Sequence, residues 1–269
     1  MEGIRQPVSF ISRVDWAKRW LMKLGLYRVA RTVYRQVANR EGLRLLKAQT
    51  EVYRAFVRPG DLCFDIGANR GVKSEALLRA GARVVAVEPQ PVCVAELRQR
   101  LGHSPEFQCV ESAVGGEVGT ATLHIAAVDV LSSVRPDWYG MEGEWVSSIT
   151  VPMTTLDALI AIHGAPRYCK IDVEGLELDV LRGLTQRLPH LSFEFHIEPA
   201  LNPVTVACLR RLSELGQYEA NVSRKEAPEL VGRWLPADRF IEHFETRIAT
   251  DPDFDYGEIY ARFLPGGAY

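Results

Sequence analysis

Hydrophobic and polar residues alternate with two different periodicities along this chain. From Trp16 to Val57, apolar residues recur every three or four positions with Arg and Lys between them, which predicts a basic amphipathic helical segment. After the turn Pro59-Gly60-Asp61, short apolar runs alternate with stretches of helical spacing. Strands separated by helices predict an α/β fold with a mostly parallel sheet that is buried on both faces.

Five short apolar runs have the length and composition of buried strands. They are Leu62–Ile66, Val84–Val87, Phe107–Val110, Tyr168–Val173 and Leu191–Ile197. Helical spacing covers Lys73–Ala80, Val92–Leu101, Thr155–His163, Leu176–Leu188 and Val204–Leu215. Two later strands are predicted over Tyr218–Ser223 and Glu258–Phe263, and an edge strand over Thr120–Ile125. The segment Asp129–Trp145 has no clear period and is typical of a loop or lid over a site.

Composition and charge divide the chain into two parts. Its 269 residues are 47% apolar and 25% charged, as in an ordinary globular protein. Residues 1–58 carry 13 Lys and Arg against 4 Asp and Glu, whereas residues 59–269 carry 19 against 30. We therefore predict a basic helical N-terminal segment, 1–58, and a main domain, 59–269. The segment is interpreted as packing on the main domain, and contact with an anionic membrane surface stays open.

No apolar run approaches the roughly 20 residues of a spanning helix, and basic residues interrupt every apolar run in the first 30 positions. The chain is therefore expected to be cytoplasmic, with peripheral membrane association left open. The basic helix has no recognisable groove-reading motif, so we expect no nucleic-acid partner. Self-association is left open.

The strongest local motif joins the first predicted strand to the first helix. In Asp65-Ile66-Gly67-Ala68-Asn69-Arg70-Gly71, the two glycines permit a tight turn close to a ligand, and Asn69 tolerates left-handed dihedral angles. A pyrophosphate-binding turn would have glycine at position 69 and no adjacent carboxylate. The charge of Asp65 suits the ammonium of an amino-acid moiety, which favours S-adenosylmethionine over NAD. Asp65, Gly67, Ala68, Asn69 and Gly71 are thus candidate cofactor-binding residues.

Two further segments extend the candidate cofactor site. Glu88 ends the second strand, 21 residues after Gly67, where a carboxylate can accept hydrogen bonds from both ribose hydroxyls. After the third strand, Glu111 and Ser112 offer polar atoms where an adenine edge would lie, although a turn into the next hairpin would use the same residues.

Charged residues also gather at the carboxyl ends of the fourth and fifth strands. Strand alternation places Lys170, Asp172 and Glu174 on one side, and three charges on a central strand are costly unless paired or functional. Lys170 is interpreted either as a structural salt-bridge partner or as part of the site. On the fifth strand, Glu194 and His196 share one face beside Asp172. His196 is interpreted as a general base or as a structural residue.

Together these segments resemble the FkbM-type methyltransferases over roughly residues 60–200. The matching segments are Phe64–Gly71, Glu88-Pro89, Ala113-Val114-Gly115, Thr155-Leu156-Asp157, Lys170–Gly175 with Glu177, and Leu181-Arg182-Gly183. The resemblance implies a class I methyltransferase (Rossmann-like) fold, a doubly wound sheet of seven strands with an antiparallel last strand. It also implies S-adenosyl-L-methionine-dependent O-methylation, with S-adenosyl-L-homocysteine as product.

The acceptor implied by the resemblance is a hydroxyl of a sugar, a glycan or glycolipid, or a polyketide-type secondary metabolite. We expect His196 or Asp172 to take the acceptor proton and Glu174 to orient the acceptor. No metal is expected, although Asp172, Glu174 and Glu194 could supply oxygen ligands to one. Two alternatives stay open: an NAD-dependent dehydrogenase, and a non-catalytic nucleotide-binding module of the same fold.

Overall fold

The computed structural model describes residues 42–126, 132–136, 145–225, 229–252 and 254–265. Contacts divide the chain into two compact units, Met1–Leu45 and Leu46–Tyr269. Most of the predicted N-terminal helix lies outside the described residues. The chain is helical over residues 42–54, and Tyr53, Phe56 and Val57 are buried in the core of the second unit. That core thus begins earlier than residue 59, and the predicted boundary at 58 stays a prediction.

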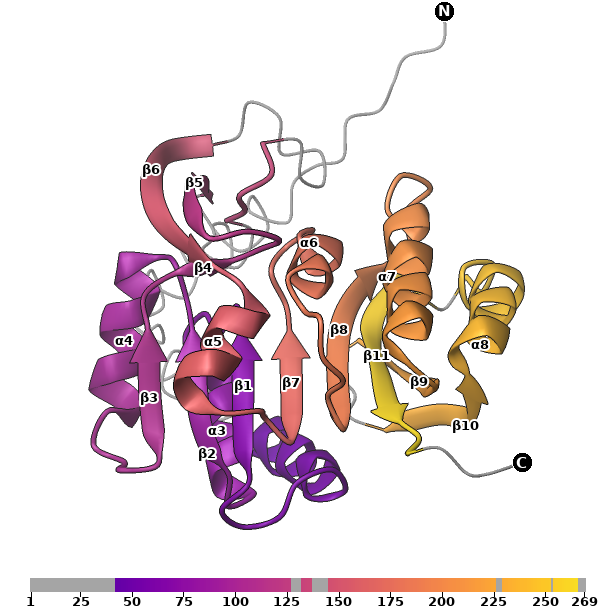
Figure 1. The fold of residues 1–269 in the computed structure, drawn as a ribbon, viewed down its shortest axis with the longest axis horizontal. Coiled ribbons are helices and arrows are strands. Elements are labelled where there is room, and N and C mark those ends of the chain that lie inside the picture. The colour runs from indigo at the N-terminus through magenta and orange to yellow at the C-terminus, as the bar shows by residue number, and fades with distance from the viewer. Residues whose placement is uncertain (1–41, 127–131, 137–144, 226–228, 253, 266–269) are drawn as a thin grey trace, which may run out of the picture. The chain divides into compact units, whose positions relative to one another are not determined.

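The second unit is built on one eight-stranded sheet (Figure 1). Its order is β10-β9-β11-β8-β7-β1-β2-β3. The strands are β1 (Leu62–Ile66), β2 (Arg83–Val87), β3 (Phe107–Val110), β7 (Tyr168–Ile171), β8 (His190–His196), β9 (Tyr218–Arg224), β10 (Leu230–Pro236) and β11 (Tyr256–Phe263). The five from β3 to β8 are parallel, whereas β11 is antiparallel to both β8 and β9. The mostly parallel sheet with an antiparallel last strand is confirmed.

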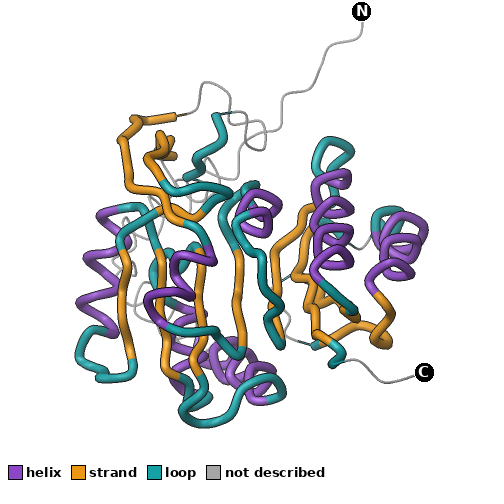
Figure 2. The backbone as a smooth tube through the Cα atoms, viewed as in Figure 1, coloured by secondary structure: helices purple, strands orange, loops and turns teal. Residues whose placement is uncertain are grey.

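Helices cover the sheet on both faces, as the alternation of strands and helices predicts (Figure 2). The helix ending at residue 54, α3 (Val72–Arg79) and α4 (Pro91–Leu101) pack on one face. The other face carries α5 (Leu156–His163), α6 (Glu177–Arg182), α7 (Asn202–Leu215) and α8 (Ala237–His243). The strand β1 is buried along almost its whole length, as expected for a central strand covered on both faces.

A second, three-stranded sheet lies at the carboxyl ends of the parallel strands. It has the order β4-β6-β5 and comprises β4 (Ala113–Val114), β5 (Gly119–Ala126) and β6 (Trp145–Thr154). Since β5 lies at an edge of this small sheet, the predicted edge strand over 120–125 is confirmed. Of the predicted loop 129–145, residues 132–136 and Trp145 are described. Ser133 forms an isolated bridge with His124, and Trp145 already belongs to β6.

Four features of the second unit differ from the prediction. The strand β7 ends at Ile171, two residues early, because the chain turns through left-handed angles at Glu174 and Gly175. The helix α6 ends at Arg182, whereas the predicted helix continues to Leu188. Leu184 and Leu188 are buried in the core, but they lie outside a helix. The expected seven strands become eight because β10 pairs with β9. A π-helical turn, η3 (Phe244–Ile248), continues α8.

The parallel arrangement brings the loops that follow β1, β2 and β7 to one edge of the sheet. Ligands of open α/β sheets bind in the crevice at this edge. Among the described residues, no helix is long and apolar enough to cross a membrane.

Candidate active site

The loop between β1 and α3 adopts the tight turn that its sequence predicts. Gly67, Asn69 and Gly71 all have positive φ angles, of 78°, 46° and 79°. The amides of Gly67 and Ala68 donate to the carbonyl of Val87, so the loop is tied to the end of β2. Asn69 occupies the left-handed conformation that its residue type tolerates.

Gly67 is required by packing within the protein. A Cβ atom on Gly67 would lie 1.6 Å from the carbonyl oxygen of Asp172, which no side-chain movement could relieve. The loop after β1 therefore touches the segment after β7 directly. This contact places the two strongest sequence motifs side by side.

Glu88 joins the loop to the end of the second strand. Its two carboxylate oxygens accept hydrogen bonds from the amides of Asn69 and Gln90, each at 2.8 Å. Burial raises the pKa of Glu88 to about 7, against the effect of these two amides. Glu88 is 5% exposed and lines a pocket, so its remaining lone pairs are placed to accept from a ligand.

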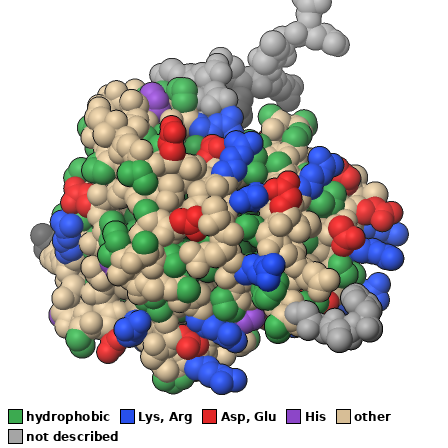
Figure 3. Space-filling model, in the orientation of Figure 1, with side chains coloured by type: hydrophobic (Ala, Val, Ile, Leu, Met, Phe, Trp, Pro, Cys, Tyr) green, Lys and Arg blue, Asp and Glu red, His purple; other side chains and the backbone are tan. Residues whose placement is uncertain are grey.

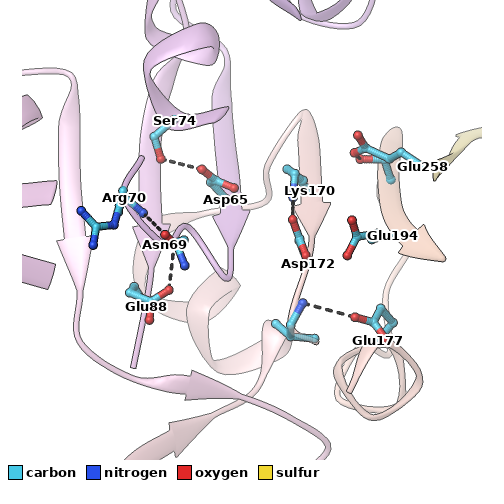
Figure 4. Close-up of polar contacts among 12 residues, drawn as sticks. Asp65, Asn69, Arg70, Ser74, Glu88, Lys170, Asp172, Glu177, Glu194 and Glu258 are labelled. Carbon is cyan, nitrogen blue, oxygen red and sulfur yellow. Dashed lines mark hydrogen bonds and ion pairs between the residues drawn. The ribbon is translucent and has the colours of Figure 1, made fainter. Parts of the chain in front are cut away.

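Asp65 is fully buried beneath the same loop. One of its oxygens, Oδ2, accepts from the Ser74 hydroxyl at 2.6 Å, and Oδ1 has no hydrogen-bond partner among the described residues (Figure 4). Burial raises its pKa, although Lys170 acts in the opposite direction. Asp65 does not line the pocket. Its predicted contact with an ammonium group stays a prediction, and the orphaned Oδ1 is the atom that would make it.

The segment after β7 begins with a buried ion pair. The ammonium of Lys170 donates to Asp172 Oδ2 at 2.6 Å, and the Lys170 side chain is 3% exposed. Burial opposes ionisation of Asp172, but Lys170 holds its pKa below the usual value. Burial disfavours the charged form of Lys170 and acts to lower its pKa. The carboxylates of Asp172, Glu258 and Asp65 outweigh burial, and the net shift of this pKa is upward. This supports the salt-bridge interpretation of Lys170.

The next strand, β8, brings Glu194 and His196 to the same place. His196 Nε2 lies 3.3 Å from Glu194 Oε2, and Glu194 faces Asp172 (Figure 4). Burial and the charge of Asp172 raise the pKa of Glu194 to about 7. Burial lowers the pKa of His196, but the Glu194 carboxylate outweighs it and the net shift is upward. The shared face predicted for these two residues is confirmed.

These segments enclose one cavity of about 330 Å³. Its lining includes the predicted cofactor residues Gly67, Asn69, Glu88 and Ser112, and the predicted catalytic residues Asp172, Glu174 and His196. The size is within the range of small-molecule sites, roughly 300–1,000 Å³. The structure thus brings predicted cofactor and catalytic residues into a single pocket.

Four predicted cofactor residues do not line this cavity: Asp65, Ala68, Gly71 and Glu111. Ala68 is buried in the loop, and Gly71 packs against Leu97, where a Cβ atom would lie 2.5 Å from the Leu97 side chain. The exposed side chain of Glu111 instead contacts Arg98 at 3.3 Å. Sequence reasoning left Ser133 and Tyr256 out of the site, and it named Glu194 only as a possible metal ligand, although all three line the cavity. For Glu194 the signal was present, since it alternates with His196.

Comparison with known proteins identifies the family. The model of the methyltransferase FkbM domain matches residues 65–214, more than half of the chain. The hexuronic acid methyltransferase AglP of Haloferax volcanii is 25% identical over 240 residues, covering 81% of this chain and 96% of that protein. The 2-O-methyltransferase NoeI of Sinorhizobium fredii is 27% identical over 172 residues, covering 57% and 71%.

Similarity to solved structures is weaker. An rRNA methylase from Streptococcus thermophilus is 10% identical, with a TM-score of 0.46 over 80% of this chain and 93% of that one. This overlap is too loose to bear on function. The domain match spans β1 to α7 and contains both halves of the pocket, from the loop after β1 to His196 on β8. The chain therefore belongs to the FkbM methyltransferase family.

Proposed function

We propose that this protein transfers a methyl group from S-adenosyl-L-methionine to a hydroxyl oxygen of a sugar, a glycan or glycolipid, or a polyketide-type secondary metabolite. The observation that carries this proposal is the charge of the pocket. Its described lining contains Glu88, Asp172, Glu174 and Glu194, but no Lys or Arg. Such a pocket suits a ligand with a positive sulfonium and an ammonium group.

The residues present fit the cofactor at its nucleoside end. Glu88 would accept hydrogen bonds from the ribose hydroxyls, and the turn through Gly67 and Asn69 would lie against the amino-acid portion. The buried, orphaned Oδ1 of Asp65 supports an ammonium group nearby. When bound, the cofactor supplies an electrophilic methyl group.

The second half of the pocket would hold the acceptor. An aliphatic hydroxyl is a weak nucleophile, so its oxygen must be held close to the methyl carbon and in line with the bond to sulfur that breaks. The hydroxyl proton then passes to Asp172 or His196, and Glu174 orients the acceptor. All three residues line the same pocket as Glu88.

The names of the relatives support a sugar acceptor. One is called a hexuronic acid methyltransferase and the other a 2-O-methyltransferase. The carboxylates of the pocket are strong hydrogen-bond acceptors and suit the hydroxyls of a polyol. The same carboxylates would repel the pyrophosphate of NAD, and membership of a methyltransferase family argues against both a dehydrogenase and a module without turnover.

Calorimetric titration of the purified protein with S-adenosyl-L-methionine and with NAD tests the donor. We expect micromolar affinity for the first, no binding of the second, and at least tenfold weaker binding in Glu88→Gln. The variant Glu111→Gln is the matched control, because its side chain lies away from the pocket and should not affect binding. Preference for NAD, or equal losses in both variants, would contradict the proposal.

The type of methylated oxygen is tested separately by incubating labelled donor with a panel of glycosides and uronates. A methyl ether on a hydroxyl survives mild alkali, whereas a methyl ester on a carboxylate is released. Alkali-stable label is the expected outcome. Alkali-labile label alone would show that the acceptor atom belongs to a carboxylate.

A further inference from the structure

We propose that Glu174, Glu194 and His196 bind one divalent cation on the acceptor side of the pocket. Each of them offers a ligand atom, and these three atoms all lie within 4.8 Å of one another. All three side chains line the cavity. The site goes beyond the proposed methyl transfer and does not depend on the identity of the methyl donor.

The spacing of the ligand atoms fits a common ion. Two ligands about 2.1 Å from an ion, at an angle of about 100°, lie about 3.2 Å apart. The distance between His196 Nε2 and Glu194 Oε2 is 3.3 Å. Ligand atoms on opposite sides of an ion lie about 4.2 Å apart. The three ligand atoms here lie within 4.8 Å of one another, so side-chain shifts of less than about 1 Å would bring all three into coordination distance of one ion.

The fold positions these side chains in advance. Glu194 and His196 alternate on β8, and their side chains are only 22% and 23% exposed. Tyr256 of β11 lies opposite His196 in the sheet and stacks on the imidazole, with ring centroids 5.9 Å apart. The carbonyl of Glu174 accepts a hydrogen bond from the Ser133 hydroxyl at 2.7 Å, which holds the loop that carries the third ligand.

Charge balance also favours a divalent ion. Lys170 neutralises Asp172, and the Glu177 carboxylate accepts from the amides of Val173 and Gly175. Glu258 accepts from the hydroxyls of Ser192 and Tyr260. When ionised, the Glu174 and Glu194 carboxylates together match the charge of one divalent cation.

The ligand set indicates the class of ion. Carboxylates favour Mg²⁺, Ca²⁺ and Mn²⁺, whereas imidazole favours later transition metals. Two carboxylates with one imidazole therefore suit an ion of intermediate character, such as Mn²⁺. Three protein ligands leave further coordination positions open towards the cavity, as in catalytic metal sites.

A cation at this position would affect the proposed reaction in two ways. An acceptor hydroxyl bound to it becomes more acidic, which helps a weak base to remove the proton. A His196 that ligates the ion through Nε2 has no lone pair there for a proton, so Asp172 becomes the proton acceptor. This second consequence rests on the proposed function, whereas the binding of the ion does not.

Titration of the metal-free, full-length protein with Mn²⁺, followed by electron paramagnetic resonance without donor or acceptor, tests the site. We expect one Mn²⁺ per chain and at least tenfold weaker binding in Glu174→Gln, Glu194→Gln and His196→Gln. The matched control is Glu214→Gln, an exposed carboxylate that pairs with Arg211. Absence of saturable binding, or affinity that is equal in all variants, would overturn the proposal.

A second measurement needs no variant. In the wild-type protein, bound Mn²⁺ broadens the amide NMR signals of nearby residues, and those of Gly175 and Ile197 should broaden first. Broadening centred on another acidic segment, such as the loop with Asp251 and Asp255, would place the ion elsewhere and refute the site. If Mn²⁺ binds as expected but S-adenosyl-L-methionine does not, the proposed function fails and the cation site stands.

Discussion

Glu88 shows how one side chain can serve both the fold and a ligand. Its carboxylate accepts from two backbone amides and so shapes the loop after β1. Its burial disfavours the ionised form, which raises its pKa from 4.5 to about 7. A native state that binds this proton more tightly than the unfolded chain loses stability as pH rises between those values. The ionised form is nevertheless the one that accepts best from ribose hydroxyls.

Ligand affinity should therefore depend on pH. We predict that binding of 5′-methylthioadenosine, a nucleoside without an ammonium group, strengthens up to about tenfold between pH 6 and pH 8 as Glu88 ionises. Calorimetry at several pH values measures this change. In Glu88→Gln the slope should vanish, and an unchanged slope in that variant would assign the titration to another group.

The surroundings of Asp65 and Lys170 could be predicted only in part from the sequence. Both are buried charges, and β1 and β7 pair them directly in register. Sequence alternation correctly indicated that Lys170 and Asp172 are close, and they form an ion pair. It could not indicate that Asp65 lies beneath the loop, because that depends on the packing of Ser74 from α3.

At the scale of elements, the site depends on the contact between the loop after β1 and the segment after β7. Parallel strands bring their carboxyl ends to one edge of the sheet. Ile66 and Ile171, the last residues of β1 and β7, are paired in the sheet, so the two loops that follow begin at the same level along the strands. Asp172 donates its amide to the carbonyl of Ile66, and its own carbonyl fills the space beside Gly67. The two halves of the pocket are thus held together by backbone contacts.

Replacement of Gly67 by alanine should therefore be much more damaging than a comparable change elsewhere. Gly60 also has a positive φ angle, of 87°, but an added Cβ there meets no atom of the described part of the chain within 4 Å. Gly60→Ala should cost about 1–2 kcal/mol of the free energy of unfolding from backbone strain alone. Gly67→Ala should cost at least about 2 kcal/mol more, because the backbone must also move.

Urea denaturation of the two variants measures this difference. Similar losses in Gly60→Ala and Gly67→Ala would show that the loop after β1 can move away from Asp172 at little cost. The close contact between the two segments would then not hold the pocket together.

At the scale of the whole molecule, the question is what the basic N-terminal residues do. On the face shown in Figure 3, the described Lys and Arg side chains are interspersed with Asp and Glu. The strongest excess of positive charge in the sequence belongs to residues 1–58. Peripheral membrane contact, the absence of a nucleic-acid partner and self-association all stay predictions, as does a cytoplasmic location.

Two truncations separate the roles of this segment. A chain that begins at Gly42 retains Tyr53 and Phe56, which contact Tyr168 in the core. We predict that it keeps its melting temperature within a few degrees and its affinity for the methyl donor, but loses binding to anionic vesicles. Thermal melting, calorimetry and vesicle co-sedimentation measure these three properties.

The matched truncation begins at Pro59 and should not fold cooperatively. It removes Tyr53, Phe56 and Val57 from the core, and the loss of one large buried aromatic side chain alone costs about 3–5 kcal/mol. A stable chain beginning at Pro59 would support the predicted boundary at residue 58. Absence of vesicle binding by the intact protein would remove the membrane hypothesis.

The sequence by itself determined the parallel strands and helices from β1 to α7 and the edge where the site lies. The period of apolar residues is a local property, and parallel strands necessarily share one edge for their carboxyl ends. For that reason Glu88, Asp172, Glu174 and His196 could be assigned to one pocket from sequence.

Only the tertiary structure decided which side chains reach that pocket. It turned Glu111 towards Arg98, buried Asp65 and added β10 to the sheet. Each of these outcomes depends on contacts between segments that are distant in the chain. Local periodicity carries no information about such contacts, because it reports which face of an element is buried and not what packs against it.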